Sequence, residues 1–503
     1  MSFRHLKSLF NPRSIAVIGA SARERRMGNV LMRNLLSGQF AGPIMPVNPR
    51  RTSVAGVLTY PSIAALPQTP DLAIICTPAP LVPRLVEELG ERGARAVMVM
   101  ANQLDTTLGA DGRPIERSIL EITRRYEMRL LGGGTLGILV PGLGLNATFS
   151  QIAARPGKLG FVSQRDTVGT MVLDWALRKK VGFSHFVSLG DSLDIGFGEV
   201  LDFLAADSGT RAILLYIESI QDRRAFMSAA RAAARNKPVI AIKAGRSPDN
   251  PLMGVSDPLF LEMPNLVSHD DVHDAALRRA GILRVDQLEE MFGAAETVLR
   301  ARPLRGNRLV VLSNGGGAGL MVEDSLYLAG YSLPALKEQT IERLRRFMSP
   351  AWNGRNPLEI RVDSEPACYE RLLKILQEER DGDAVLLIHT PNALSSSIDT
   401  AQQVIATARE TGINLMTCWV GDESVEKERN LFINAGIATF DSPEHAASAF
   451  LHMHRHRIAS EVLMEVPTSE PEAFKPDAAR ARAVIQGALA QSRASLTESE
   501  SKD

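Results

Sequence analysis

The residues best suited to chemistry near the start of the chain are a glycine turn and a run of arginines. The stretch Ser14–Ser21 (SIAVIGAS) is followed by Arg23–Arg26 and Gly28. A buried strand feeding a helix over 27–36 points backbone N–H groups and a helix N-terminus into the turn. This arrangement predicts a phosphate site. An ordinary strand–helix turn is the alternative, because the strict glycine pattern of dinucleotide sites is absent.

Small and polar residues also follow three later apolar runs, at 48–50, 77–79 and 101–103. The carboxyl ends of parallel strands meet at one edge of a sheet, where ligands bind, so these segments are expected to form one site. The alternative is that they are only turn residues. The predicted ligand-binding residues are Gly19, Ala20, Ser21, Arg26, Gly28, Asn48, Pro49, Arg50, Thr77, Pro78, Ala79 and Asn102.

The elements that must position these residues alternate in type along the chain. Short, nearly continuous apolar runs predict strands at Pro43–Val47, Asp71–Thr77 and Ala96–Met100, with helices between them. Such runs are typical of parallel sheets covered on both faces. The same alternation resumes at Lys158–Gln164 and again at Arg308–Asn314, so the fold class is α/β with three alternating units.

Length and composition support this division and exclude some partners. The 503 residues are enough for about three domains. The 57 basic and 57 acidic side chains balance, so no net charge favours nucleic acid or an anionic membrane surface. No apolar run reaches the ~18 residues of a membrane span, and the N-terminus lacks a signal-peptide core. Three scattered cysteines predict neither a disulfide framework nor a metal site, as expected in a reducing cytoplasm.

A series of motifs, taken in order, resembles the N-terminal portion of ADP-forming acyl-CoA (acetate–CoA) synthetases. The stretches are SIAVIGAS, PVNP, DLAIICTPA, KLGFVSQ, FVSLGDSLDI, LLYIESI, KPVIAIKAGRS, DAALRRAGILRV, RLVVLSNGGGAG and FDSPEHA. The resemblance covers 9–456. It implies a CoA-binding Rossmann-like domain followed by two flavodoxin-like ligase domains of the succinyl-CoA synthetase type. MRNLLSGQFAGPIMPV, GFSHFVSLGDSLDI and RPLRG look closest to the synthetase-like region of bacterial protein-lysine acetyltransferases, which is generally regarded as non-catalytic.

Departures from the family pattern fall at two loops. Where the family usually has GPN, this chain has Gly132–Gly134, so the asparagine position is Gly134. The usual SQSG at the head of the second unit's first helix is Ser163, Gln164, Arg165 and Asp166, of which the first three are the predicted phosphate-binding residues. Arg165 attracts an anion, whereas Asp166 repels one. Glu218, in YIES, matches the family glutamate that is thought to hold the catalytic histidine.

The position of that histidine depends on the register of the comparison. Matching Asp271–Gly281 without a gap, the favoured register, places Glu262 at the histidine position. Matching Ser268 and His269 instead makes His269 the phosphoryl acceptor, at the cost of a deletion. Three further histidines, at 452, 454 and 456, are expected on a solvated helix face rather than at a metal.

Two functions remain open. One is a CoA or acyl-CoA-binding, regulatory synthetase-like protein. The other is an active alpha-type subunit that works through a phosphohistidine, with ATP or ADP bound only by a separate ATP-grasp part. Partners implied by the resemblance are that ATP-grasp part, an acetyltransferase domain, or a second copy of the chain. The expected divisions are 1–140, 150–300 and 306–458, with 459–503 a linker and the start of a missing ATP-grasp part.

Overall fold

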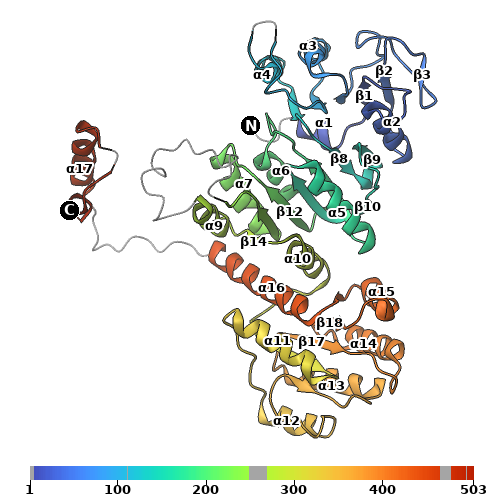
Figure 1. Cartoon of the computed structure of the whole chain (residues 1–503), viewed down its shortest axis with the longest axis vertical. Helices are drawn as coiled ribbons and strands as arrows, with labels where there is room; N and C mark the ends of the chain where they lie inside the picture. Colours follow the sequence, from blue (N-terminus) through green and yellow to red (C-terminus); the bar gives the residue numbers. More distant parts are fainter. Residues whose placement is uncertain (1–4, 110–111, 248–268, 465–476, 494, 503) are drawn as a thin grey trace.

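The computed structural model describes residues 5–109, 112–247, 269–464, 477–493 and 495–502. Three sheet-centred bodies follow one another along the longest axis of the molecule (Figure 1). They are called the first body (6–132), the second body (137–300) and the third body (309–464). The fold class is confirmed: each body contains a mainly parallel sheet with helices packed on it.

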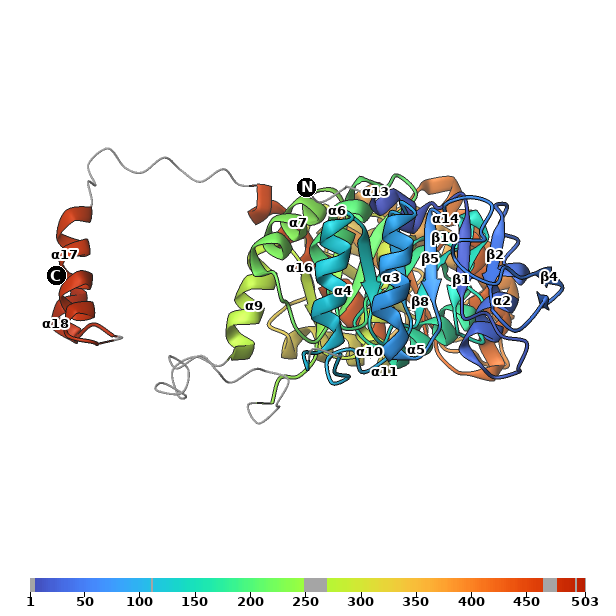
Figure 2. The same cartoon turned by 90° about the horizontal axis from the view of Figure 1, so that it is seen from above.

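The first body is a five-stranded parallel sheet in the order β2-β1-β5-β6-β7. Alternate residues of β1 face opposite sides: Ile15 and Val17 pack with α1 and α2, and Ala16 and Ile18 with α3 and α4. Figure 2 shows α3 and α4 side by side across one face. The bounds are α1 Leu6–Phe10, β1 Ile15–Ile18, α2 Met27–Ser37, β2 Ile44–Val47, β3 Ser53–Val54, β4 Val57–Leu58, β5 Leu72–Ile75, α3 Val82–Glu91, β6 Ala96–Val99, α4 Ile115–Arg125 and β7 Arg129–Gly132.

The second body is a seven-stranded sheet in the order β14-β13-β12-β10-β11-β8-β9. Its first two strands are antiparallel, since β8 pairs with β11 and β9 with β8. The bounds are β8 Gly137–Val140, β9 Leu145–Thr148, β10 Arg155–Ser163, α5 Asp166–Arg178, β11 Gly182–Ser188, α6 Phe197–Ala206, β12 Ala212–Ile217, α7 Arg223–Asn236, β13 Val239–Lys243, α9 His269–Arg279, β14 Leu283–Val285 and α10 Leu288–Arg300.

The passage from the first sheet to the second falls between β7, which ends at Gly132, and β8, which begins at Gly137. The chain changes sheets before residue 140, because β8 pairs with Phe186 and Val187 of β11. Residues 141–156 contain β9 and the start of β10. Helix α10 begins only at Leu288, because Leu283–Val285 pairs with β13 as an edge strand.

The third body repeats the topology of the first in the order β16-β15-β17-β18-β19. The bounds are β15 Leu309–Ser313, α11 Gly316–Leu328, α12 Glu338–Arg345, β16 Leu358–Glu359, α13 Pro366–Glu379, β17 Ala384–His389, α14 Ser397–Thr411, β18 Leu415–Trp419, α15 Glu426–Ala435, β19 Ala438–Phe440 and α16 Pro443–Met464. Two further helices are α17 Ala478–Ala490 and α18 Glu498–Lys502. The linker expected from 459 therefore cannot begin before α16 ends at Met464.

Helix α16 corrects the prediction of a solvated histidine face. It packs on α10 of the second body and α11 of the third, so its N-terminal half is buried on most sides (Figure 1). His452 and His454 are both buried, and the ring of His454 meets Tyr331 edge to face at 5.0 Å. In the described part of the chain, no group of three histidine, cysteine or carboxylate side chains is arranged to hold a metal ion.

None of the described helices is both long enough and apolar enough to cross a membrane. The three cysteines are free thiols, and burial raises the pKa of Cys76 and of Cys418 to about 12.

Candidate functional site

An open cleft of about 900 Å³ lies at the carboxyl edge of the first sheet. It spans the point where the strand order reverses, between β1 and β5, which is where open α/β sheets bind ligands. Ten of the twelve residues predicted to bind a ligand line it; Ala20 and Pro49 do not. The lining also includes Ala22, Arg23, Met27, Arg51, Cys76, Pro80, Met100, Ala101, Gln103 and Thr107.

Ala20 was assigned to this site from its place in the turn, but its methyl group is 0% exposed and packs in the core. Its carbonyl accepts a hydrogen bond of 2.7 Å from Asn48 Nδ2. Asn48 Oδ1 in turn accepts the backbone N–H of Arg50 at 2.8 Å. Asn48 therefore ties the ends of β1 and β2 together, and Ala20 offers a ligand no side chain.

The turn after β1 brings helix α2 unusually close to the strand end. Gly19 has φ +86°, and a Cβ at Gly28 would lie 2.2 Å from the Gly19 carbonyl oxygen. Arg26 precedes α2 in an extended conformation, and no side chain caps that helix end. The free N–H groups of the first turn and the helix dipole thus favour an anion there.

The remaining lining fits a phosphorylated ligand. Four exposed arginines, at 23, 26, 50 and 51, stand at the rim. On the β5 side, the buried Oγ1 of Thr77 has no hydrogen-bond partner among the described residues. Buried hydroxyls are normally satisfied, so this atom is available to a ligand. The cleft thus combines counter-charges for phosphates with a free hydroxyl on the opposite wall.

A second candidate site lies at the corresponding edge of the second sheet, between β10 and β12, where the strand order also reverses. The Gln164 Oε1 atom accepts the backbone N–H groups of Glu218 at 2.6 Å and of Ser219 at 3.0 Å. The Ser163 Oγ atom accepts the N–H of Arg165 at 3.1 Å. Two of the three predicted phosphate-binding side chains are therefore already engaged in holding the loop.

The third, Arg165, forms an ion pair with Glu218. Its Nε lies 2.8 Å from Glu218 Oε2 and 2.9 Å from Oε1, and the Tyr216 hydroxyl donates to Oε1 at 3.4 Å. The hydrogen bond to Glu218 raises the pKa of Arg165, and burial together with Glu218 raises the pKa of Tyr216. Glu218 is thus held by this chain's own arginine.

The N-terminus of α5 already carries a negative charge. Asp166 is the first residue of the helix, and its Oδ1 accepts the N–H of Thr167 at 2.7 Å. A carboxylate here takes the position at which a helix dipole would stabilise an external anion.

Lys243 also reaches this strand edge, and the sequence reasoning did not single it out. Its ammonium is buried and donates to the carbonyls of Glu218 at 2.8 Å and Ala244 at 2.6 Å. Burial lowers the pKa of Lys243. The motif KAGRS, which is part of the family resemblance, is the sequence signal from which Lys243 could have been identified.

The glycine loop 132–134 lies between the two sites. A Cβ at Gly134 would lie 3.1 Å from Asn102 Oδ1 in the cleft, and one at Gly133 would lie 2.7 Å from Asp191 Oδ2 in the second body. Burial raises the pKa of Asp191, and the positive charge of Arg165 opposes that rise. The end of the cleft therefore approaches the Arg165–Glu218 pair through one shared loop.

The two candidates for the nucleophile position are Glu262 and His269. Glu262 lies outside the described residues. Helix α9 begins at His269, but the side chain of His269 lies outside the described part as well.

Family models match all three bodies. The matches are a CoA binding domain (13–141), a succinyl-CoA ligase like flavodoxin domain (156–298) and a ligase-CoA domain (309–463).

Curated relatives and a solved structure agree with these matches. The chain is 34% identical over 451 residues to the ADP-forming acetate–CoA ligase I of Archaeoglobus fulgidus, covering 90% of this chain and 64% of that protein. It is 32% identical to the subunit alpha of the ADP-forming acetate–CoA ligase II of Pyrococcus furiosus, covering 88% of this chain and 96% of that subunit. The dinucleotide-forming acetyl-coenzyme A synthetase 1 of Ca. Korarchaeum cryptofilum, solved with phosphate and ADP, superposes with a TM-score of 0.84. Sequence identity there is 27%, over 93% of this chain and 100% of the other.

Proposed function

The chain belongs to the family of ADP-forming acetate–CoA ligases, and on that premise we propose that it binds coenzyme A or an acyl-CoA in the first-body cleft. We propose further that the protein acts as a regulatory, CoA-responsive member of the family and does not complete the ligase reaction by itself. The narrower resemblance to protein-lysine acetyltransferases, with such a domain as partner, stays a prediction, because the relatives described above are ligases and synthetases.

CoA binding is supported by the chemistry of the cleft. The molecule carries several phosphate groups, and the rim offers Arg23, Arg26, Arg50 and Arg51 beside an uncapped helix N-terminus. Hydrogen bonds between charged groups contribute roughly 1.5–3 kcal/mol each, which is enough for specific binding when several act together. The loop 132–134 then leads from the cleft toward the second body.

The single observation that carries the regulatory assignment is the Arg165–Glu218 ion pair at the second site. By the resemblance, Glu218 matches the family glutamate that is thought to hold the catalytic histidine, and here the Arg165 guanidinium is paired with that carboxylate. A phosphate brought to the start of α5 would also meet the carboxylate of Asp166. Two unit charges of like sign at ~4 Å repel by about 1 kcal/mol even in water, and by more near a protein surface.

A second candidate function is favoured by the extent of the similarity to alpha subunits, which spans 96% and 97% of two such chains. In that case the chain is an active alpha-type subunit. Phosphate displaces the CoA thiol from acyl-CoA to give an acyl phosphate. Its phosphoryl group passes to His269 with release of the carboxylate, and then, on a partner ATP-grasp subunit, to ADP, which becomes ATP. His269 is the acceptor that this reaction requires, and Glu218 orients it.

Two measurements separate the candidates. Calorimetric titration with CoA tests the cleft, and Thr77→Val, which removes the free hydroxyl, is expected to weaken binding. The protein is then incubated with acetyl-CoA and labelled phosphate, and with labelled ATP and an ATP-grasp subunit of a related ligase. We expect no acid-labile, base-stable label. Label that is lost in His269→Ala would establish the ligase instead, and absence of CoA binding would contradict both.

Assembly and location remain proposals too. The subunit similarity supports a partner or a second copy of the chain, which light scattering at micromolar concentration, with and without that ATP-grasp subunit, would reveal. The three free thiols are in keeping with a reducing, cytoplasmic environment.

A further inference from the structure

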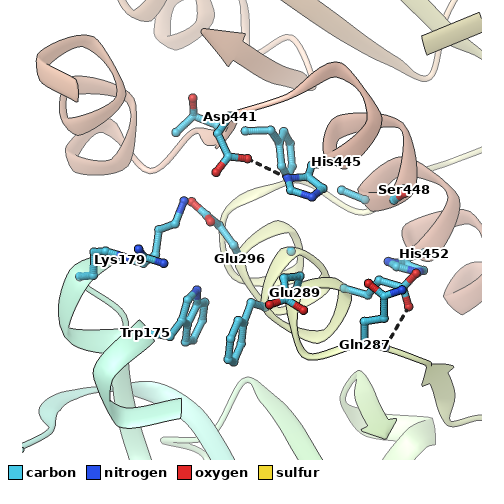
Figure 3. A pocket seen from close by; sticks show the side chains of 16 residues that line it. Trp175, Lys179, Gln287, Glu289, Glu296, Asp441, His445, Ser448 and His452 are labelled. Atoms are coloured by element: carbon cyan, nitrogen blue, oxygen red, sulfur yellow. Dashed lines mark hydrogen bonds and ion pairs between the residues drawn. The ribbon is translucent and has the colours of Figure 1, made fainter. Parts of the chain in front are cut away.

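A second, smaller cavity of about 260 Å³ lies where the second body meets the third (Figure 3). Three segments enclose it: the C-terminal end of α5, helix α10, and the end of β19 with helix α16. The lining includes Trp175, Lys179, Glu296, Thr439, Asp441 and His452. The Arg165–Glu218 pair lies at the N-terminal end of α5 and this cavity at its C-terminal end. The 13 residues of α5 rise by about 1.5 Å each, so the two sites are ~20 Å apart and are separate.

The lining carries both signs of charge. Glu296 lies deep, 3% exposed, with its carboxylate 2.5 Å from the guanidinium of Arg300. Asp441 lies at the mouth, where its carboxylate is 2.8 Å from His445 Nδ1. Lys179 approaches both acids from α5 (Figure 3). Burial raises the pKa of Glu296, and the positive charges of Arg300 and Lys179 oppose that rise. Burial also acts to raise the pKa of Asp441, but the hydrogen bond with His445 and the charge of Lys179 outweigh it, so this pKa is lowered. The lining also includes Arg178, Glu289 and Glu290, so a ligand meets two basic side chains and several carboxylates in one small space.

Two buried polar atoms in the lining lack a partner. Thr439 and His452 are 2% and 5% exposed, and neither Thr439 Oγ1 nor His452 Nδ1 is hydrogen-bonded within the described residues. An unsatisfied buried polar group costs about 1–3 kcal/mol, and such groups are rare in native proteins. Two of them beside one cavity indicate that something else supplies the hydrogen bonds.

One wall is apolar. The rings of Trp175 and Phe292 are stacked, with centroids 4.4 Å apart and planes inclined by 7°. Because the cavity is near the lower limit of the ~300–1,000 Å³ typical of ligand pockets, it suits a small molecule with one hydrocarbon side.

We propose that this cavity binds a small zwitterion of the amino-acid type. The ammonium group of the ligand faces Asp441 and Glu296, its carboxylate faces Lys179 and Arg178, and Thr439 and His452 complete the hydrogen bonds. A simple anion would meet the carboxylates and a simple cation would meet the two basic groups, whereas a zwitterion satisfies both sets. Since α5 and α10 belong to the second body and α16 to the third, the bound ligand would fix these bodies against each other.

The test uses the full chain. The standard L-amino acids are screened at millimolar concentration for an increase in melting temperature, and the best is titrated by calorimetry. L-Phenylalanine is compared directly with phenethylamine and 3-phenylpropionate, which keep only the ammonium or only the carboxylate. We expect at least one amino acid to bind, and each half-molecule to bind at least about tenfold more weakly than phenylalanine.

The variants Lys179→Met and Asp441→Asn are expected to weaken amino-acid binding at least about tenfold. Asp174→Asn, an exposed change on the same helix outside the lining, serves as the matched control and should bind as the unchanged protein does. Unchanged affinity for CoA in each variant shows that the fold is intact. The proposal is overturned if no amino acid binds, if the half-molecules bind as tightly as phenylalanine, or if the two cavity variants bind like the control.

Discussion

Arg165 Nε lies between the two carboxylate oxygens of Glu218, at 2.8 and 2.9 Å, although 53 residues separate the two in the chain. The pair joins the start of α5 to the end of β12, across the point where the second sheet reverses its strand order. Arg165 is half exposed and Glu218 mostly buried, so the arginine closes the site from the solvent side. This closure sets the expected behaviour of the second site.

Arg165→Ala is expected to change the free energy of unfolding by less than about 1 kcal/mol, because half-exposed ion pairs contribute little. Gln164→Ala should cost about 2–3 kcal/mol, since it leaves the buried N–H groups of Glu218 and Ser219 without an acceptor. Urea unfolding of both variants checks that Gln164→Ala lowers the free energy of unfolding more than Arg165→Ala does. Equal costs would mean that Gln164 does not hold this loop.

Arg26→Ala and Arg50→Ala are each expected to weaken CoA binding about tenfold or more, because each removes a cation from the rim of the cleft. The affinity of the unchanged protein should also fall as salt rises. Calorimetry measures both effects. Arg84→Ala, an exposed arginine of α3 paired with Glu88, is the control and should bind normally. Loss of binding in the control alone would place the site elsewhere.

Arg129→Met is expected to lower the free energy of unfolding by about 2 kcal/mol. Arg129 belongs to the first body, and its Nε lies 2.9 Å from Asp194 of the second in a largely buried contact, so the variant removes the cation that neutralises this carboxylate. The comparison variant Arg125→Met breaks a more exposed pair with Glu87 inside the first body and should cost less than about 1 kcal/mol. Denaturant titration distinguishes them, and similar losses would show that Arg129 does not join the bodies.

Acid should destabilise the protein through its buried histidines. Burial lowers the pKa of His389 from 6.5 to about 4, and that of His452 likewise. The unfolded chain binds these protons near pH 6.5 and the folded protein only near pH 4. The contribution of these neutral histidines to the free energy of unfolding is therefore fully present above pH 6.5. It is lost as the pH falls toward 4, by at most about 1.4 kcal/mol per pH unit for each histidine.

Unfolding free energies measured from pH 7 to 4 give this slope. His389→Gln should reduce the slope, because the variant removes one of the two histidines that take up a proton. The variant also loses the contact between His389 Nδ1 and the Tyr369 hydroxyl. That loss lowers the stability at every pH, so the slopes of the two proteins can still be compared. An unchanged slope would exclude His389 as a source of the acid sensitivity.

Much of the candidate site followed from local sequence pattern. The residues at 19–21, 48–50, 77–79 and 101–103 come after apolar runs that form parallel strands, and parallel strands place their carboxyl ends at one edge. That conclusion does not depend on which residues of neighbouring strands are paired. The pattern did not say which way each side chain points, so Ala20 was assigned to a ligand although its methyl group fills the core.

The sequence by itself therefore determined the α/β class, the repeated strand–helix units and the edge at which a ligand binds, because these depend on local periodicity and on the direction of parallel strands. Only the tertiary structure decided the contacts between distant segments. It paired Arg165 with Glu218, moved β8 into the second sheet, and buried His452 and His454 by packing α16 between two bodies. Whether a helix is buried depends on which other elements cover each of its faces. The composition of the helix by itself does not indicate which elements those are.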